Sequence, residues 1–156
     1  MPKLSKPATI VSWIFQIVIA FILGQTLFFK FTGAPETVAL FEVLGAEPMG
    51  RYATALAELV CVILLLVPKT HVIGAIGSLG VISGAIMAHI TKLGISIDPV
   101  ALGNEGLVPL EGPSLFTMAM VVFVSSLVVL VIRRSQLPII GAKFAAESSS
   151  LPSTDS

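Results

Sequence analysis

Four long apolar runs dominate this sequence and leave it few possible folds. They cover residues 8–31, 51–67, 71–91 and 114–132, and each can cross about 30 Å of hydrocarbon, which takes roughly 17 to 25 helical residues. Because the bilayer core offers no hydrogen-bond partners to the backbone, a uniformly apolar run that enters it is expected to be helical. The runs therefore predict an all-α fold, an integral membrane bundle of four helices.

The composition agrees with a membrane location. Apolar residues make up 55% of the 156 residues and charged residues 12%, with a mean hydropathy of +1.00, whereas soluble domains are about 25% charged. Net charge is zero and the basic residues form no cluster, which excludes a nucleic-acid footprint. The single cysteine, Cys61, cannot form an internal disulfide, and no spacing typical of a zinc or iron–sulfur site occurs. We therefore expect no intrinsic metal or cofactor.

The domain organisation is expected to be simple, with one membrane domain over residues 1–134. Two lysines precede the first run, as in a secretory signal, but the run far exceeds the roughly 7 to 15 residues of a signal core, so we interpret it as a retained span. Residues 94–113 predict a long outward loop, of a length often found in lids or binding loops. Residues 135–156 are rich in serine and predict a disordered cytoplasmic tail.

The basic residues predict the orientation of the spans. One side of a four-span bundle would carry Lys3, Lys6, Lys69, Arg133, Arg134 and Lys143. Since Lys and Arg are enriched in cytoplasmic segments, both termini are expected in the cytoplasm.

The first outward connection predicts a short interfacial helix between spans one and two. Pro35 stands where a helix would start and Gly45 where it would stop. Between them Val38, Phe41 and Leu44 recur at helical spacing, which predicts an apolar side against lipid or the bundle.

The second and third spans are expected to pack as a hairpin, because only residues 68–70 separate them. In the third span Gly80, Gly84 and Ala88 recur every four residues, with Gly74 and Gly77 nearby. Small residues at this spacing let helices approach closely. The pattern predicts tight packing, with a cavity-lining face as the alternative.

A carboxylate inside the second span requires a partner. Glu58 lies seven residues, about 10 Å of helix, from Arg51. Ionisable groups in membrane helices cost about 2.5 to 3.5 kcal/mol on insertion scales and usually face the bundle interior. Lys30, at the end of the first span, and His89, near the end of the third, share its depth. We predict that Lys30, Glu58 and His89 converge near the outer face.

Other polar residues extend this predicted site. Arg51 and Thr54 share a helix face with Glu58, and Gln25, a turn deeper than Lys30, is expected to extend the network inward. One interpretation is a polar pocket, with a histidine able to titrate near neutral pH, for a quinone headgroup, a proton relay or a small anion. The other is a buried charge network that only holds the bundle together.

Three motifs carry a family resemblance. They are FILGQTLFFKFTG, LAELVCVILLLVP and GAIMAHITKLGI, which contain Lys30, Glu58 and His89. In order and spacing they resemble the DoxX family of small four-helix membrane proteins, over about residues 10–134. The resemblance implies a bacterial cytoplasmic (inner) membrane protein whose recurrent polar positions are these three residues. It also implies a link to membrane oxidoreductases, such as a thiosulfate:quinone oxidoreductase subunit, or to membrane-protein trafficking and assembly.

The leading hypothesis is an accessory subunit of a membrane redox or quinone-linked system, with quinone as the candidate ligand. The chain has no autonomous catalytic motif, so its catalytic residues and its status as an enzyme stay open. The alternative is a non-catalytic scaffold or assembly factor whose buried charges are structural. A small transporter is a third hypothesis, which inverted repeats would indicate. The expected partners are the lipid bilayer and other membrane subunits or a second copy of the chain.

Overall fold

The computed structural model describes residues 5–93 and 114–134. Within them the chain forms helices α1 (Lys6–Thr32), α2 (Pro35–Val43), α3 (Met49–Leu66), α4 (His71–Ala88) and α5 (Ser114–Ile132), and a π-helical turn, η1 (His89–Leu93), continues α4. Four of these helices are long and apolar enough to cross a membrane. The predicted all-α, four-span fold is confirmed. The predicted loop at 94–113 and the predicted tail at 135–156 lie outside the described residues.

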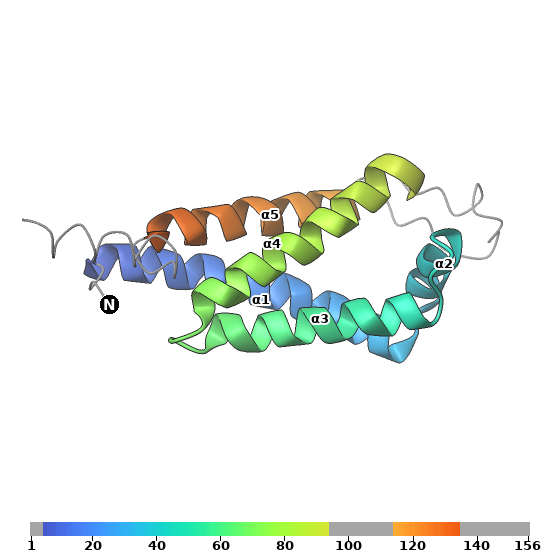
Figure 1. The fold of residues 1–156 in the computed structure, drawn as a ribbon, viewed down its shortest axis with the longest axis horizontal. Coiled ribbons are helices and arrows are strands. Elements are labelled where there is room, and N and C mark those ends of the chain that lie inside the picture. The colour runs from blue at the N-terminus through green and yellow to red at the C-terminus, as the bar shows by residue number, and fades with distance from the viewer. Residues whose placement is uncertain (1–4, 94–113, 135–156) are drawn as a thin grey trace, which may run out of the picture.

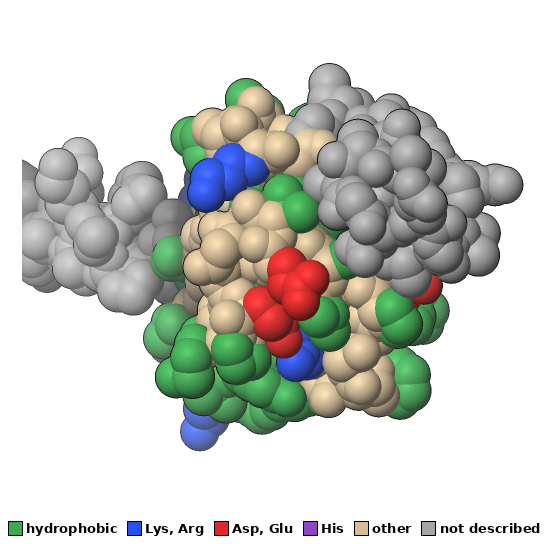
Figure 2. Space-filling model, turned by 90° about the vertical axis from the view of Figure 1, so that its right-hand side faces the viewer, with side chains coloured by type: hydrophobic (Ala, Val, Ile, Leu, Met, Phe, Trp, Pro, Cys, Tyr) green, Lys and Arg blue, Asp and Glu red, His purple; other side chains and the backbone are tan. Residues whose placement is uncertain are grey.

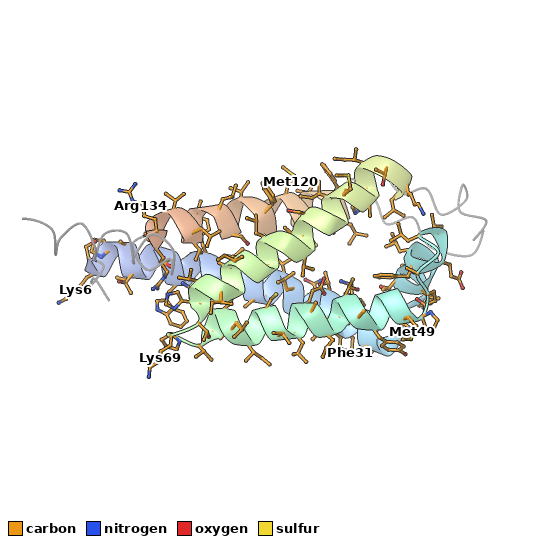
Figure 3. The ribbon with its side chains drawn as sticks, in the orientation of Figure 1. Lys6, Phe31, Met49, Lys69, Met120 and Arg134 are labelled. Carbon is orange, nitrogen blue, oxygen red and sulfur yellow. The ribbon has the colours of Figure 1, made fainter. Side chains whose placement is uncertain are left out.

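The four long helices run side by side, and α2 crosses one end of the bundle at a steep angle (Figure 1). α1 packs against α3 and α5, and α4 packs against the same two helices. We call the end that holds α2 the α2 end, and the opposite end, where α1 begins and α5 ends, the termini end. Lys6, Lys69 and Arg134 all lie at the termini end and point outward (Figure 3).

The short helix α2 occupies the place expected of an interfacial helix. It begins at Pro35, and Gly45 follows it in the left-handed conformation, with φ of +70°. Lys92 of η1 donates a hydrogen bond to the carbonyl of Leu44, at 3.3 Å. Because a cation is favoured at the negative end of a helix dipole, this contact holds η1 against α2 across the α2 end.

The outward surface of the long helices is apolar. Large hydrophobic side chains are exposed along all four, including Phe21 at 71%, Ile90 at 66% and Val131 at 65%. A soluble protein would aggregate through such a surface. It is therefore the lipid-facing side of the bundle, and the polar side chains of the spans lie mostly on the buried side.

The glycines of α4 fall into two groups. Gly74 and Gly77 face α3 in the predicted hairpin: a Cβ at Gly74 would lie 2.5 Å from the Leu65 nitrogen. Gly80 and Gly84 are exposed, and nothing in the described chain lies within 4 Å of a Cβ built there. The predicted close packing is therefore seen at Gly74 and Gly77, and within the described chain it is not seen at Gly80 and Gly84. Six residues at 3.6 per turn carry Gly80 well away from the face that Gly74 presents.

Candidate functional site near the α2 end

Glu58 forms an ion pair with Lys30 between α3 and α1. Lys30 Nζ donates to Glu58 Oε1, and the two side chains are only 15% and 6% exposed. Thr26 Oγ1 lies 3.3 Å from Glu58 Oε2 and 2.9 Å from the carbonyl of Leu23. A hydroxyl has one proton, so Thr26 cannot donate to both acceptors at once. Glu58 Oε1 thus has Lys30 as its donor, whereas Glu58 Oε2 competes with the Leu23 carbonyl for the single proton of Thr26.

The pair arises from spacing within each helix. Thr26 and Lys30 are four residues apart, which places both on the side of α1 that faces α3. Thr26 was not predicted from the sequence, although its spacing of four residues from Lys30 was an available signal.

Arg51 joins the start of α3 to the end of α1. Its Nε lies 2.9 and 3.0 Å from the two carboxylate oxygens of Glu47, and its Nη2 lies 2.8 Å from one of them. Its Nη1 donates to the main-chain carbonyl of Lys30. The carbonyls of the last helical turn have no partner within the helix, so this bond caps α1. It also sets the height of α3 against α1 and so brings Glu58 to Lys30.

The backbone at the end of α1 leaves room for Arg51. Gly33 ends the helix with φ of +67°, a conformation that glycine adopts without the cost of a side chain. A Cβ built there would lie 3.7 Å from Arg51 Nη1. Glu47 and Arg51 lie at the α2 end, where Figure 2 shows acidic and basic side chains next to each other among hydrophobic ones.

Arg51→Met is expected to loosen the α2 end, because Glu47 and the Lys30 carbonyl both lose their donor. We expect a lower unfolding temperature in detergent and faster acylation of the Lys30 amine by an amine-specific reagent. Mass spectrometry of the labelled peptide measures the second effect. Lys92→Met is the matched control, since it removes a basic residue at the same end that makes one exposed hydrogen bond. Equal labelling of Lys30 in both variants would contradict the capping role of Arg51.

Two predicted members do not join the pair. The Thr54 hydroxyl bonds back to carbonyls of its own helix, at 2.9 and 3.0 Å, as serine and threonine in helices often do. Gln25 is exposed, because two residues of helix turn it to the side opposite the buried Leu23. The prediction that Gln25 extends the network inward is therefore wrong.

His89 is buried where α4 passes into η1. Its ring packs edge-on against Phe116 of α5, with centroids 5.8 Å apart. None of the described contacts joins His89 to Lys30 or Glu58. The structure brings Lys30 and Glu58 together as predicted, and it shows His89 against Phe116 of α5, toward which α4 leans at this end of the bundle (Figure 1).

A second polar cluster, which was not predicted from the sequence, lies at the termini end. Arg133 Nε lies 2.6 Å from Ser12 Oγ, and its Nη1 lies 2.7 Å from His71 Nε2. Gln16 Nε2 donates to Ser12 Oγ at 2.7 Å. All four side chains are buried. The available signal was Ser12 and Gln16, four residues apart in an otherwise apolar run.

Arg133 sets the protonation pattern of this second cluster. Burial lowers the pKa of the Arg133 guanidinium, because desolvation disfavours its charged form. An arginine nevertheless stays protonated at physiological pH and can only donate. His71 Nε2 therefore accepts the bond from Arg133, and the ring proton resides on Nδ1.

The Lys30–Glu58 pair offers an ammonium donor and a carboxylate acceptor side by side in a largely dehydrated place. Such a pair can hydrogen-bond the oxygens of a small ligand and exchange a proton with it. In residues 5–93 and 114–134 no three His, Cys, Asp or Glu side chains are grouped as metal ligands.

Comparison with known proteins places this site within a family. The pattern of the DoxX-like family matches residues 14–101, more than half of the chain, and this stretch contains Lys30, Glu58 and His89. No similar protein was found among curated proteins or among solved structures. Because the family pattern covers most of the first three spans and the structure has four apolar helices, this chain belongs to the DoxX-like family and is a multi-pass membrane protein.

Proposed function

We propose that this protein is an accessory subunit of a membrane redox system linked to quinone, and that Lys30 and Glu58 form its polar site. The observation that carries the proposal is the buried ion pair itself. Stability alone is a weak reason to keep such a pair, because apolar residues of similar volume often serve as well or better. Ionisable groups within membrane helices commonly mark a ligand or proton site.

The geometry supports a ligand that accepts and returns hydrogen bonds. Lys30 would donate to a carbonyl oxygen of a quinone headgroup. Glu58 Oε2, whose contact with Thr26 is a shared one, would accept from a hydroxyl of the reduced form and hold its proton. A bound quinone supplies two-electron, two-proton chemistry, and a partner subunit would exchange the electrons. These residues thus fit the headgroup by their donor and acceptor set.

The proposed setting is the cytoplasmic membrane, with the termini end toward the cytoplasm. The outward-pointing Lys6, Lys69 and Arg134 at that end support this orientation, since basic residues favour the cytoplasmic side. The Lys30–Glu58 pair then lies toward the outer face.

Photolabelling with a short-chain azidoquinone in membranes tests this function. We expect the label on peptides of α1 and α3 around Lys30 and Glu58, and about tenfold less label in Glu58→Gln, since a lost charged hydrogen bond costs about 1.5 to 3 kcal/mol. Glu42→Gln is the matched control, because Glu42 is an exposed carboxylate at the same end. Label spread evenly over the spans, or left unchanged by Glu58→Gln, would overturn the proposal.

A second candidate function is a scaffold or assembly factor. The contacts of Arg51 with Glu47 and with the Lys30 carbonyl favour it, because together with the ion pair they tie α1 to α3. The double variant Lys30→Met with Glu58→Met separates the two functions. A scaffold that stays folded should still co-purify its partner subunits and support their assembly. A quinone site should lose its photolabel although the fold is intact.

A further inference from the structure

Three polar atoms in the middle of the bundle lack a hydrogen bond to oxygen or nitrogen in the described chain, and one of them, Ser78 Oγ, has only the Cys61 thiol beside it. They are Gln16 Oε1 of α1, Ser78 Oγ of α4 and Ser126 Oγ of α5, and all three side chains are 0% exposed. A buried polar group left without a partner costs about 1 to 3 kcal/mol. Proteins usually satisfy such groups with internal water, which makes about three hydrogen bonds.

Ser78 and Ser126 differ from Ser83, a lipid-facing serine on the same helix as Ser78. Ser83 of α4 is exposed and bonds to the carbonyl of Leu79 at 2.6 Å, the usual solution for a hydroxyl in an apolar helix. Ser78 and Ser126 make no such bond. Their hydroxyls therefore require another hydrogen-bond partner inside the core.

These groups lie on one path that begins at the second polar cluster. The contact between Arg133 and His71 fixes α5 and α4 at the same height. Ser126 and Ser78 are each seven residues further toward the α2 end, about 10 Å and two turns along their helices, and so on the same faces. Gln16 stands one turn above Ser12, which contacts Arg133.

The path continues to the candidate site through Cys61 of α3. Its Sγ would lie 2.8 Å from a Cβ built at Gly77 of α4, and the thiol lies beside Ser78. Cys61 is buried and stands three residues, about 5 Å of helix, from Glu58. Polar groups thus recur from the termini end nearly to the ion pair.

We propose that internal water molecules fill the buried seam lined by Gln16, Ser78, Ser126 and Cys61. They bond to Gln16, Ser78 and Ser126 and carry protons between the termini end and the level of Cys61 and Glu58. Each water accepts one proton and passes on another, so no charge accumulates in the seam. The inference concerns water and does not depend on the proposed quinone chemistry. In that chemistry the seam would be the route by which Glu58 exchanges protons with the cytoplasmic side.

Cys61 reports directly on the seam because it is the only cysteine in the chain. Its S–H stretch gives one infrared band in a window without other protein absorption, and transfer to D₂O converts the band to S–D only where water reaches the thiol. We expect exchange within minutes in the intact protein. A dry core would instead exchange through rare opening, over hours or longer.

Variants identify the route. Ser78→Ala with Ser126→Ala should slow the thiol exchange about tenfold or more, toward the opening-limited rate, and Gln16→Leu should slow it by closing the termini end. Ser83→Ala is the matched control and should leave the rate unchanged. Circular dichroism and gel filtration check that each variant is folded. A thiol that stays unexchanged for hours in the intact protein would overturn the proposal without any variant, and so would folded Ser78, Ser126 and Gln16 variants that exchange at the original rate.

Discussion

Glu58→Ala should lower the free energy of unfolding by about 3 to 5 kcal/mol, the cost of breaking a buried ion pair by removing one partner. The variant leaves the Lys30 ammonium largely buried between α1 and α3 without its carboxylate. Titration with a denaturing detergent, followed by circular dichroism, measures the change. Glu42→Ala removes an exposed carboxylate at the same end and should stay within about 0.5 kcal/mol of the original protein.

The double variant Lys30→Met with Glu58→Met should recover most of that loss, because apolar residues need no compensating charge and can match or exceed the stability of the pair by about 1 to 4 kcal/mol. A double variant as unstable as Glu58→Ala would mean that the hydrogen bonds, rather than the balance of charge, hold α1 to α3. Stability of the double variant also matters for function, since it allows quinone labelling and partner assembly to be measured in a folded protein.

Gly74→Val should disrupt the α3–α4 hairpin. Even a Cβ at this position would lie 2.5 Å from the Leu65 nitrogen and 2.8 Å from the Leu64 carbonyl carbon, which are backbone atoms that cannot rotate away. Overpacking typically costs about 1 to 3 kcal/mol, occasionally more. Because Gly74→Val would force the backbones of α3 and α4 apart, we expect a loss of stability at the upper end of this range. Lower yield of folded protein and a lower unfolding temperature are the expected observations.

The matched control for this prediction is Gly80→Ala on the same helix. Nothing in the described chain lies within 4 Å of a Cβ at Gly80, so the substitution should be neutral or stabilise α4 by up to about 1 kcal/mol through helix propensity. Equal losses of stability in Gly74→Val and Gly80→Ala would contradict the assignment of one face of α4 to the hairpin and the other to the lipid.

Much of the candidate site could be predicted because the membrane imposes a strict requirement. A carboxylate in the second span needs a nearby cation, and Lys30 is the basic residue that ends the first span at matching depth. Thr26 and Glu47 could have been predicted from spacing. Thr26 stands four residues before Lys30 on α1, and Glu47 stands four residues before Arg51 at the start of α3. The positions of the Gln25 and Thr54 side chains could not be predicted in this way, because the depth of a residue in the membrane does not determine the direction in which its side chain points.

The sequence by itself determined the number, type and approximate limits of the helices, because apolar length against bilayer thickness and the Pro and Gly signals act locally. Only the tertiary structure decided which face of each helix is buried, since that depends on how α3 packs against α1 and how α4 packs against α3 and α5. It placed Gly80 outside and Gly74 inside, turned His89 toward Phe116, and drew Arg133 into the bundle beside Ser12 and His71. A run that is apolar on all sides has no periodic contrast from which to read such a choice.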